Sequence, residues 1–273
     1  MKRTPDECFA DLPDWPYLPN YVEDLSGYEG LRMHYVDEGP RDAAATFLCI
    51  HGEPSWAYLF RKMIPVFTAA GHRAVAVDMF GFGRSDKPAR DDTYTYHFHR
   101  NALLRFVEKL DLENVCLVVQ DWGGILGLTL PLESSARYTR LIVMNTTLPA
   151  GEDAGRGFAD WRAFNRSQPD LDIAGLMKRA TPILTEAEAA AYAAPFPDKS
   201  YKGGVRRFPE LVMMKGDGGE ELTELSREGV ATSLKARCFW SEEWAGSAFM
   251  AVGMQDPVLG APTMMVLHGT IRN

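Results

Sequence analysis

The sequence is poor in cysteine and carries no excess of positive charge. Its four cysteines, Cys8, Cys49, Cys116 and Cys238, lie far apart among 273 residues and form no CxxC pair. This spacing argues against a disulfide framework or a thiolate metal site, so we expect free thiols and no bound metal. The formal net charge is -8, which makes a nucleic-acid-binding surface unexpected.

The sequence also lacks a long apolar run. No stretch of about 18 apolar residues is present, so no membrane-spanning helix is predicted. The first residues, Met1 to Glu7, become acidic and lead into no apolar segment, unlike a signal peptide. With 46% hydrophobic and 24% charged residues, the composition is typical of a globular protein. We therefore expect a cytoplasmic protein without a membrane partner.

What the sequence does contain is an alternation of strand and helix patterns. Apolar runs and one alternating stretch predict strands at 31–39, 45–50, 74–78, 115–119 and 141–145. Helical patterns separate several of them, at 58–67 and 96–110. Residues 1–28, rich in proline and aromatics, should form an extended arm. The alternation predicts an α/β fold, a mostly parallel sheet with helices on both faces.

The pattern changes after residue 146. Only helical pieces follow, at 158–165, 173–180 and 185–192. Thr185 and Glu188 have the spacing of a capping box at the start of the last piece. A strand pattern returns at 248–254, and a short helix is expected at 264–268. We divide the chain into a first core segment (1–146), a helical cap (147–220) and a second core segment (221–273).

One motif, Gln120-Asp121-Trp122, lies where a buried strand gives way to glycines and a helical stretch. Strand, tight turn and helix with a reactive residue at the apex is the nucleophile-elbow pattern of α/β-hydrolases. The apex residue is Asp121, which could also be a plain helix N-cap. As a nucleophile, a carboxylate attacks carbon and forms an alkyl ester. That chemistry suits displacement of a leaving group from saturated carbon, or opening of an epoxide.

Two other polar motifs follow predicted strands, His51-Gly52-Glu53-Pro54 and Gln255-Asp256. Ligands bind beyond the carboxyl ends of parallel strands, so both motifs should converge with Asp121. The backbone N–H groups of Glu53 and Trp122 are expected to form an oxyanion hole. His51 is expected to be structural, because its loop supplies backbone donors.

Two tryptophans have the chemistry to hold a halide. Tryptophan only donates, through its indole N–H, so Trp122 can bind a halide leaving group without offering it a competing nucleophile. Trp161, in the predicted cap, could supply a second N–H from above. Packing within the cap remains the other interpretation of Trp161.

In combination, these motifs resemble the haloalkane dehalogenases. The resemblance rests on stretches 51–58, 119–124, 157–161, 184–198 and 251–256. It is strongest to the subgroup whose acid follows the strand after the cap and whose second halide donor is a cap tryptophan. The resemblance implies an α/β-hydrolase fold with a helical cap and no cofactor or metal. It also implies a small halogenated alkane and water as reactants, with a halide ion released, and we expect a monomer.

The resemblance assigns roles by position. Asp121 would be the nucleophile, Trp122 and Trp161 the halide donors, and Asp256 the acid that orients a histidine base. Glu53 and Trp122 would supply the oxyanion-hole amides. Apolar cavity-wall residues would be Phe158, Phe208, Pro209, Val212 and Leu259. Ordinary core packing stays open for each of these five.

The histidine base is not identifiable. In the family it lies in a turn after one further strand beyond the acid, but here only His268 follows Asp256. His268 falls in the predicted helix at 264–268 and in no matching context, so we do not assign it as the base. We expect a truncated form that lacks the last strand and helix; a protein truly without the base is the other reading. Such a chain would release halide once and stall at the ester.

Two other functions compete. An epoxide hydrolase would share the Asp nucleophile and would activate the epoxide oxygen with cap tyrosines, for which Tyr192 and Tyr201 are candidates. Trp122 beside the nucleophile favours a halide instead. A non-catalytic binding protein of the same fold would explain the missing base, but not the retention of Asp121, Trp161 and Asp256.

Overall fold

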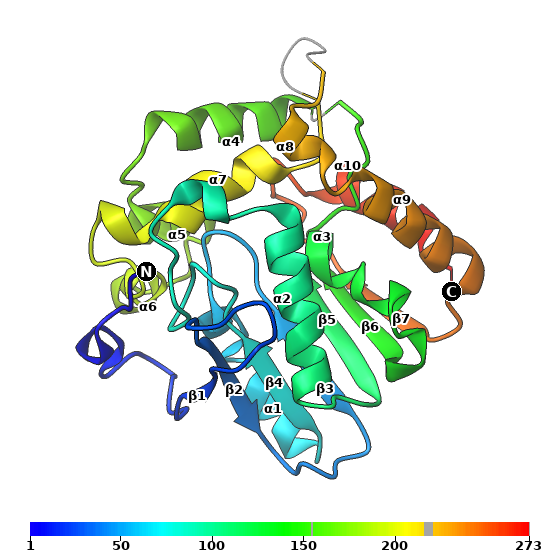
Figure 1. Cartoon of the computed structure of the whole chain (residues 1–273), viewed down its shortest axis with the longest axis horizontal. Helices are drawn as coiled ribbons and strands as arrows, with labels where there is room; N and C mark the ends of the chain where they lie inside the picture. The colour runs from blue at the N-terminus through cyan, green and yellow to red at the C-terminus, as the bar shows by residue number, and fades with distance from the viewer. Residues whose placement is uncertain (154, 216–220, 273) are drawn as a thin grey trace.

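The structure is a computed structural model that describes residues 1–153, 155–215 and 221–272. A central sheet runs in the order β1-β2-β4-β3-β5-β6-β7 (Figure 1). Strands β3 to β7 are parallel, while β1 and β2 join one edge antiparallel. The strands are β1 (Asn20–Val22), β2 (Met33–Glu38), β3 (Thr46–Ile50), β4 (Arg73–Val77), β5 (Val115–Gln120), β6 (Tyr138–Met144) and β7 (Ser247–Ala251).

The central strands are buried as their continuous apolar runs predict. Every residue of β4 and all but the last of β5 are buried, because helices cover both faces of a doubly wound sheet. Cys49 on β3 and Cys116 on β5 are free thiols in this layer, as expected. Burial raises the pKa of the Cys116 thiol to about 11, which makes it an inert core residue.

Helices of the core connect and flank these strands. They are α1 (Ile64–Ala69), α2 (Tyr96–Lys109), α3 (Trp122–Gly127), α9 (Val230–Cys238) and α10 (Ala261–Thr270). Shorter turns are η1 (Asp6–Phe9), η2 (Ala57–Phe60), η3 (Asp91–Thr93), η4 (Leu130–Leu132), η5 (Ser135–Arg137) and η7 (Phe239–Glu243). The helix expected at 58–67 is divided into η2 and α1. Pro65 lies in the first turn of α1 and has no N–H with which to continue a helix from η2.

The N-terminal arm is less extended than predicted. It contains η1 and β1, and it buries Phe9 and Trp15. Both rings pack edge-on against Trp56, at centroid distances of 5.5 and 5.0 Å. The arm is therefore part of the hydrophobic core, because burying its aromatic side chains removes more apolar surface from water than leaving the arm in solvent would.

The region predicted as a cap folds as helices that lie together above one end of the sheet (Figure 1). They are α4 (Gly155–Ser167), α5 (Ile173–Ala180), α6 (Glu186–Ala193), η6 (Lys199–Tyr201) and α7 (Gly203–Leu211), followed by α8 (Glu224–Arg227). The capping box of Thr185 and Glu188 is present at the start of α6. The predicted cap boundary at residue 220 lies outside the described residues, and the three-segment division stays a prediction.

Glu188 also ties α6 to the core. Its carboxylate accepts a hydrogen bond from Arg61, which follows η2, at 2.8 Å, and Arg61 also donates to the hydroxyl of Tyr192 at 3.1 Å. Hydrogen bonds from Thr185, Arg61 and Lys62 lower the pKa of Glu188. In the part of the chain that the structure describes, no helix is long and apolar enough to cross a membrane.

Candidate active site

Asp121 occupies a tight turn between β5 and α3. Its backbone has φ 52° and ψ -124°, a strained conformation for a residue other than glycine. Its N–H donates to the Asn145 carbonyl at 2.9 Å, and the Thr146 hydroxyl donates to the Asp121 carbonyl at 2.6 Å. Its side chain makes no capping hydrogen bond to α3. Asp121 thus stands at the N-cap position of α3 without capping the helix through its side chain.

The glycines around the elbow have no room for a side chain. A Cβ on Gly123 would lie 1.9 Å from the Ile50 carbonyl oxygen, and one on Gly124 would lie 2.1 Å from Thr146 Oγ1. A Cβ on Gly52, in the loop after β3, would lie 2.3 Å from Asp121 Oδ1. The turn thus depends on glycine on both sides, since close backbone approach is what glycine permits.

The Asp121 carboxylate is partly buried and hydrogen-bonded to the backbone. Its Oδ1 accepts the N–H of Glu53 at 2.7 Å. Burial raises the pKa of Asp121 to about 6, the N–H groups of Trp122 and Glu53 oppose that rise, and the charge of Asp256 adds to it. The carboxylate is therefore mostly ionised at neutral pH, yet poorly solvated. Those are suitable conditions for a nucleophile.

A cavity of about 210 Å³ opens beside Asp121. Nine of the residues singled out by sequence meet at its wall: Glu53, Asp121, Trp122, Phe158, Trp161, Pro209, Val212, Asp256 and Leu259. The remaining lining residues are Gln120, Ile125, Thr147, Met214, Val258 and Thr263. The wall thus combines strand-end loops of the core with helices from the predicted cap.

Phe208 is not at the wall, contrary to expectation. It is fully buried, and its ring lies behind Trp122 at a centroid distance of 4.5 Å. It also packs on Phe82 at 4.8 Å. The neighbouring Pro209 takes the wall position because successive residues of α7 face different directions. Phe208 supports the indole instead of contacting the cavity.

The two cavity indoles have free N–H groups. Among the described residues, neither Trp122 nor Trp161 donates a hydrogen bond, although both line the cavity. By contrast, the indole N–H of Trp56 donates to the Ala191 carbonyl at 3.0 Å, and that of Trp240 to the Leu128 carbonyl at 2.8 Å. Buried indole N–H groups usually find such partners, although that of Trp244, away from this cavity, has none among the described residues. Trp122 and Trp161 differ from it in lining one cavity, where their free donors can meet an anionic or polar ligand.

Asp256 follows β7 and is fixed by an asparagine that the sequence did not single out. Asn145 Nδ2 donates to Asp256 Oδ2 at 2.9 Å and to the Gly253 carbonyl at 3.1 Å. The Gly253 N–H donates back to Asn145 Oδ1 at 2.6 Å. Asp256 Oδ1 accepts the N–H groups of Val258 and Leu259 at 2.8 and 2.9 Å. Asn145 thus links the end of β6 to the acid loop. The only signal in the sequence was that Asn145 is a polar residue at the end of the apolar run predicted as a strand at 141–145.

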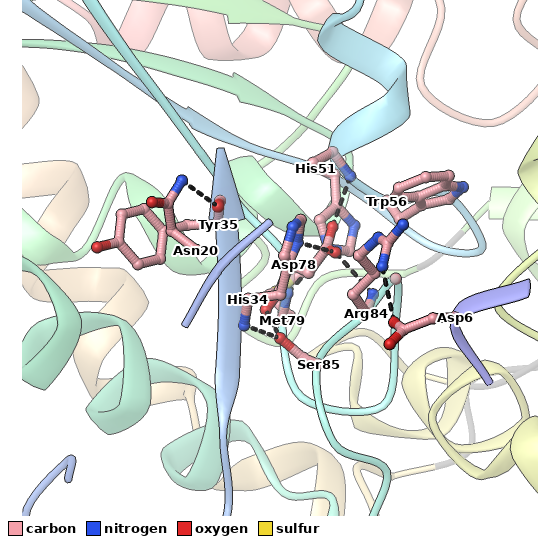
Figure 2. Close-up of polar contacts among 12 residues, drawn as sticks. Asp6, Asn20, His34, Tyr35, His51, Trp56, Asp78, Met79, Arg84 and Ser85 are labelled. Carbon is pink, nitrogen blue, oxygen red and sulfur yellow. Dashed lines mark hydrogen bonds and ion pairs between the residues drawn. The ribbon is translucent and has the colours of Figure 1, made fainter. Parts of the chain in front are cut away.

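No histidine of the described chain lines the cavity or bonds to Asp256. His51 is engaged on both ring nitrogens: Nδ1 lies 2.8 Å from the Gly52 carbonyl, and Nε2 accepts the Met79 N–H at 3.0 Å (Figure 2). That pattern makes Nδ1 the donor and leaves the ring neutral, and burial lowers its pKa. His34 pairs with Asp78 at 2.6 Å in the same buried network. Both histidines are structural.

His268 lies elsewhere. It is an exposed residue on α10 and lines a separate hollow with Phe249 and Met250 of β7. The two cap tyrosines considered for epoxide chemistry are also outside the cavity. Tyr192 accepts from Arg61, and the ring of Tyr201 lies under the Lys2 ammonium at 4.8 Å. Within the described residues, no group of histidine, cysteine and carboxylate side chains could hold a metal ion.

Comparisons with known proteins agree with this arrangement. Residues 45–267 match the family model described as the alpha/beta hydrolase fold. A haloalkane dehalogenase of Psychrobacter cryohalolentis is 51% identical over 214 residues, which cover 77% of this chain and 70% of that protein. Another, from Mycolicibacterium paratuberculosis, is 38% identical over 97% of this chain and 86% of its own.

A solved structure has a very similar fold. It is titled as the tetrameric structure of the haloalkane dehalogenase DpaA from Paraglaciecola agarilytica, with a TM-score of 0.94 and 52% identity. The match covers 100% of this chain and 88% of that one. Identities of 38% to 52% over most of the chain, together with the match of residues 45–267 to the family model, show that this chain belongs to the haloalkane dehalogenases of the α/β-hydrolase fold.

Proposed function

We propose that the protein hydrolyses small haloalkanes to an alcohol and a halide ion through an ester on Asp121. A lone pair of the Asp121 carboxylate forms a C–O bond to the carbon that bears the halogen. The carbon–halogen bond breaks, and the halide leaves with its electron pair. Water then adds to the ester carbonyl, the alcohol departs, one proton is released and the carboxylate is restored.

The observation that carries this proposal is the pairing of a partly buried carboxylate with two unpaired indole donors on one cavity. Trp122 and Trp161 would bind the departing halide, where negative charge develops in the transition state. Neither indole can compete as a nucleophile. The modest volume, about 210 Å³, favours short-chain substrates.

The second step would use the amides of Glu53 and Trp122 to stabilise the tetrahedral oxyanion. The Glu53 N–H already donates to Asp121 Oδ1. Asp256 would orient a histidine base, but no histidine within the described residues contacts it. We therefore propose that a polypeptide of these 273 residues forms the ester faster than it hydrolyses it.

Halide binding tests the site without requiring turnover. Bromide should quench part of the tryptophan emission of the chain, while sulfate at equal ionic strength should not. Trp161→Phe should remove a large part of the quenching. Trp15→Phe is the matched control, since Trp15 packs on Trp56 away from the cavity. Equal quenching in both variants would contradict the halide site.

Bromide release from 1,2-dibromoethane tests the activity itself. About one equivalent per chain, released in a single phase, is expected for the 273-residue polypeptide. Release of many equivalents would contradict the stalled ester while supporting dehalogenation. No release, together with no quenching, would contradict the proposed function.

The oligomeric state of the chain is a separate prediction. We expect a monomer, although the related DpaA structure is tetrameric, and sedimentation would test this.

A further inference from the structure

Three carboxyl groups share the wall of the cavity: Glu53, Asp121 and Asp256. Across the described lining residues there is no lysine, arginine or histidine to balance them. Carboxylates placed together in a poorly solvated cavity repel one another, so ionising all of them is costly. At least one should hold a proton at neutral pH.

The three groups differ in what stabilises their ionised forms. Asp121 accepts the Glu53 N–H at 2.7 Å, and the Trp122 N–H also favours its anion. Asp256 accepts three donors, from Asn145 Nδ2, Val258 N and Leu259 N. Hydrogen bonds to the charged form of a carboxyl favour ionisation. Both aspartates are therefore equipped to carry a negative charge.

Glu53 is equipped for the opposite. Its carboxyl has no hydrogen-bond donor or ion-pair partner in the described part of the chain, and Oε1 is buried without a partner. Burial first, and then the charge of Asp121, raise the pKa of Glu53 well above its usual range. A neutral carboxylic acid needs fewer partners than a carboxylate and can itself donate one hydrogen bond.

We propose that Glu53 is the proton-holding residue of the cavity: it stays a neutral acid beside ionised Asp121, and this preserves the affinity of the cavity for the leaving halide. The proposal rests on the proposed function only for the identity of the anion. Glu53 is a positioning residue here. Its side chain would act through the charge balance of the site, whereas its backbone N–H contacts the nucleophile directly.

Few other titratable groups lie near enough to change the charge of the cavity. The cap helices and the segment after them contribute Phe158, Trp161, Pro209, Val212 and Met214 to the wall, none of which titrates. His51, in the same loop as Glu53, is held neutral by its two hydrogen bonds. The pH-dependent charge felt by a bound halide should therefore come from the carboxyl groups of the cavity wall.

The proton can be located directly. Infrared difference spectra at pH 7.5 between the wild-type chain and Glu53→Gln should contain the carbonyl band of a protonated carboxyl, present in wild type only. Glutamine has the size of the neutral acid and should preserve the fold. Absence of that band would overturn the proposal. This measurement needs no substrate or halide, so it is independent of whether the proposed dehalogenation is correct.

The consequence for the site is measured by bromide quenching from pH 4 to 10. In wild type, bromide affinity should weaken as Asp121 ionises near pH 6. It should weaken again, about tenfold, as the Glu53 band disappears, because each added charge repels the anion. Glu53→Gln should keep only the first step, and Asp121→Asn only the second. If the Glu53 carbonyl band persists to pH 10, Glu53 stays neutral over the whole range, and wild type should then show no second loss of bromide affinity. A second step that survives in Glu53→Gln, or one at a pH where the band is unchanged, would overturn the proposal.

Discussion

The elbow around Asp121 and the segment from β7 to α10 contribute one carboxylate each to the same cavity, yet they are built differently. The elbow follows β5, which pairs with β3 on one side and β6 on the other, and Val118 and Val119 of this strand are entirely buried. In the other segment, Phe249 on β7 is 63% exposed and Val266 on α10 is 70% exposed. β7 pairs only with β6 among the described strands. Asp121 is thus fixed by the core, whereas Asp256 is fixed by Asn145 and by the amides of its own loop.

This difference suggests that the two halves of the reaction depend on different parts of the molecule. On the proposed mechanism, alkylation of Asp121 needs the elbow and the two indoles, whereas the oxyanion amides act only when water attacks the ester. Hydrolysis of the ester also needs the acid loop and a base. Removing support from one region should therefore leave the function of the other largely intact.

The largest effect is expected for Asp121→Asn. The amide is a far weaker nucleophile than the carboxylate, so bromide release from 1,2-dibromoethane should fall by at least about 10³-fold. Circular dichroism should report an unchanged fold, since asparagine has the same shape and retains an acceptor for the Glu53 N–H. Release at the wild-type rate would exclude Asp121 as the nucleophile.

Packing at the elbow should be intolerant of a single methyl group. Gly123→Ala places a Cβ 1.9 Å from the Ile50 carbonyl oxygen, and we expect a loss of about 3 kcal/mol in the free energy of unfolding. Gly269→Ala on α10 is the matched control, because nothing lies within 4 Å of its added Cβ. That variant should be neutral or slightly stabilised. Urea titrations that place both variants at the same stability would remove the contrast between the two regions.

Asn145→Ala should separate the two regions. It removes three hydrogen bonds to the acid loop and should lower the free energy of unfolding by about 2 kcal/mol. Formation of the ester on Asp121 should change by only about threefold, because the acid serves the second step. Mass spectrometry of the adduct over time gives that rate. A collapse of alkylation in a folded variant would show that Asn145 supports the elbow as well.

The smallest effect is a dependence of stability on pH. The pKa of Asp121 is raised from 3.8 to about 6 in the folded chain, so between these values the native state binds more protons than the unfolded state. The Asp121 contribution to stability therefore increases as pH falls from about 7 to 4. Asp121→Asn should be more stable than wild type at pH 8, by about 2 kcal/mol, and equal to it at pH 4. Equal unfolding midpoints at both values would contradict the raised pKa.

The sequence predicted the elbow well because its signals are local. A buried strand, a polar apex and two glycines define β5, Asp121 and α3 without reference to distant residues. The helix at 173–180 and the capping box at Thr185 are local in the same way, and both are present. Trp122 was found through its chemistry beside Asp121, whereas the halide role of Trp161 came from the resemblance, because its residues alone left packing within the cap open.

What the sequence missed depends on contacts between distant segments. Asn145 acquires its role from Gly253 and Asp256, more than a hundred residues away. Phe208 and Pro209 are adjacent, and only the packing of α7 decides which of them reaches the cavity. Helices α7 and α9 were not predicted: Gly203, Gly204 and Pro209 interrupt the helical signal of α7, and α9 has no clear apolar stripe.

The central claim is that Asp121 attacks the carbon bearing the halogen. It is tested most directly by incubating the 273-residue polypeptide with 1-bromobutane and measuring the intact mass, followed by peptide mapping. The account predicts a mass increase of one butyl group, located on the peptide that contains Asp121, and no increase in Asp121→Asn. An unmodified chain that also releases no bromide, or a butyl group located on another residue, would contradict it.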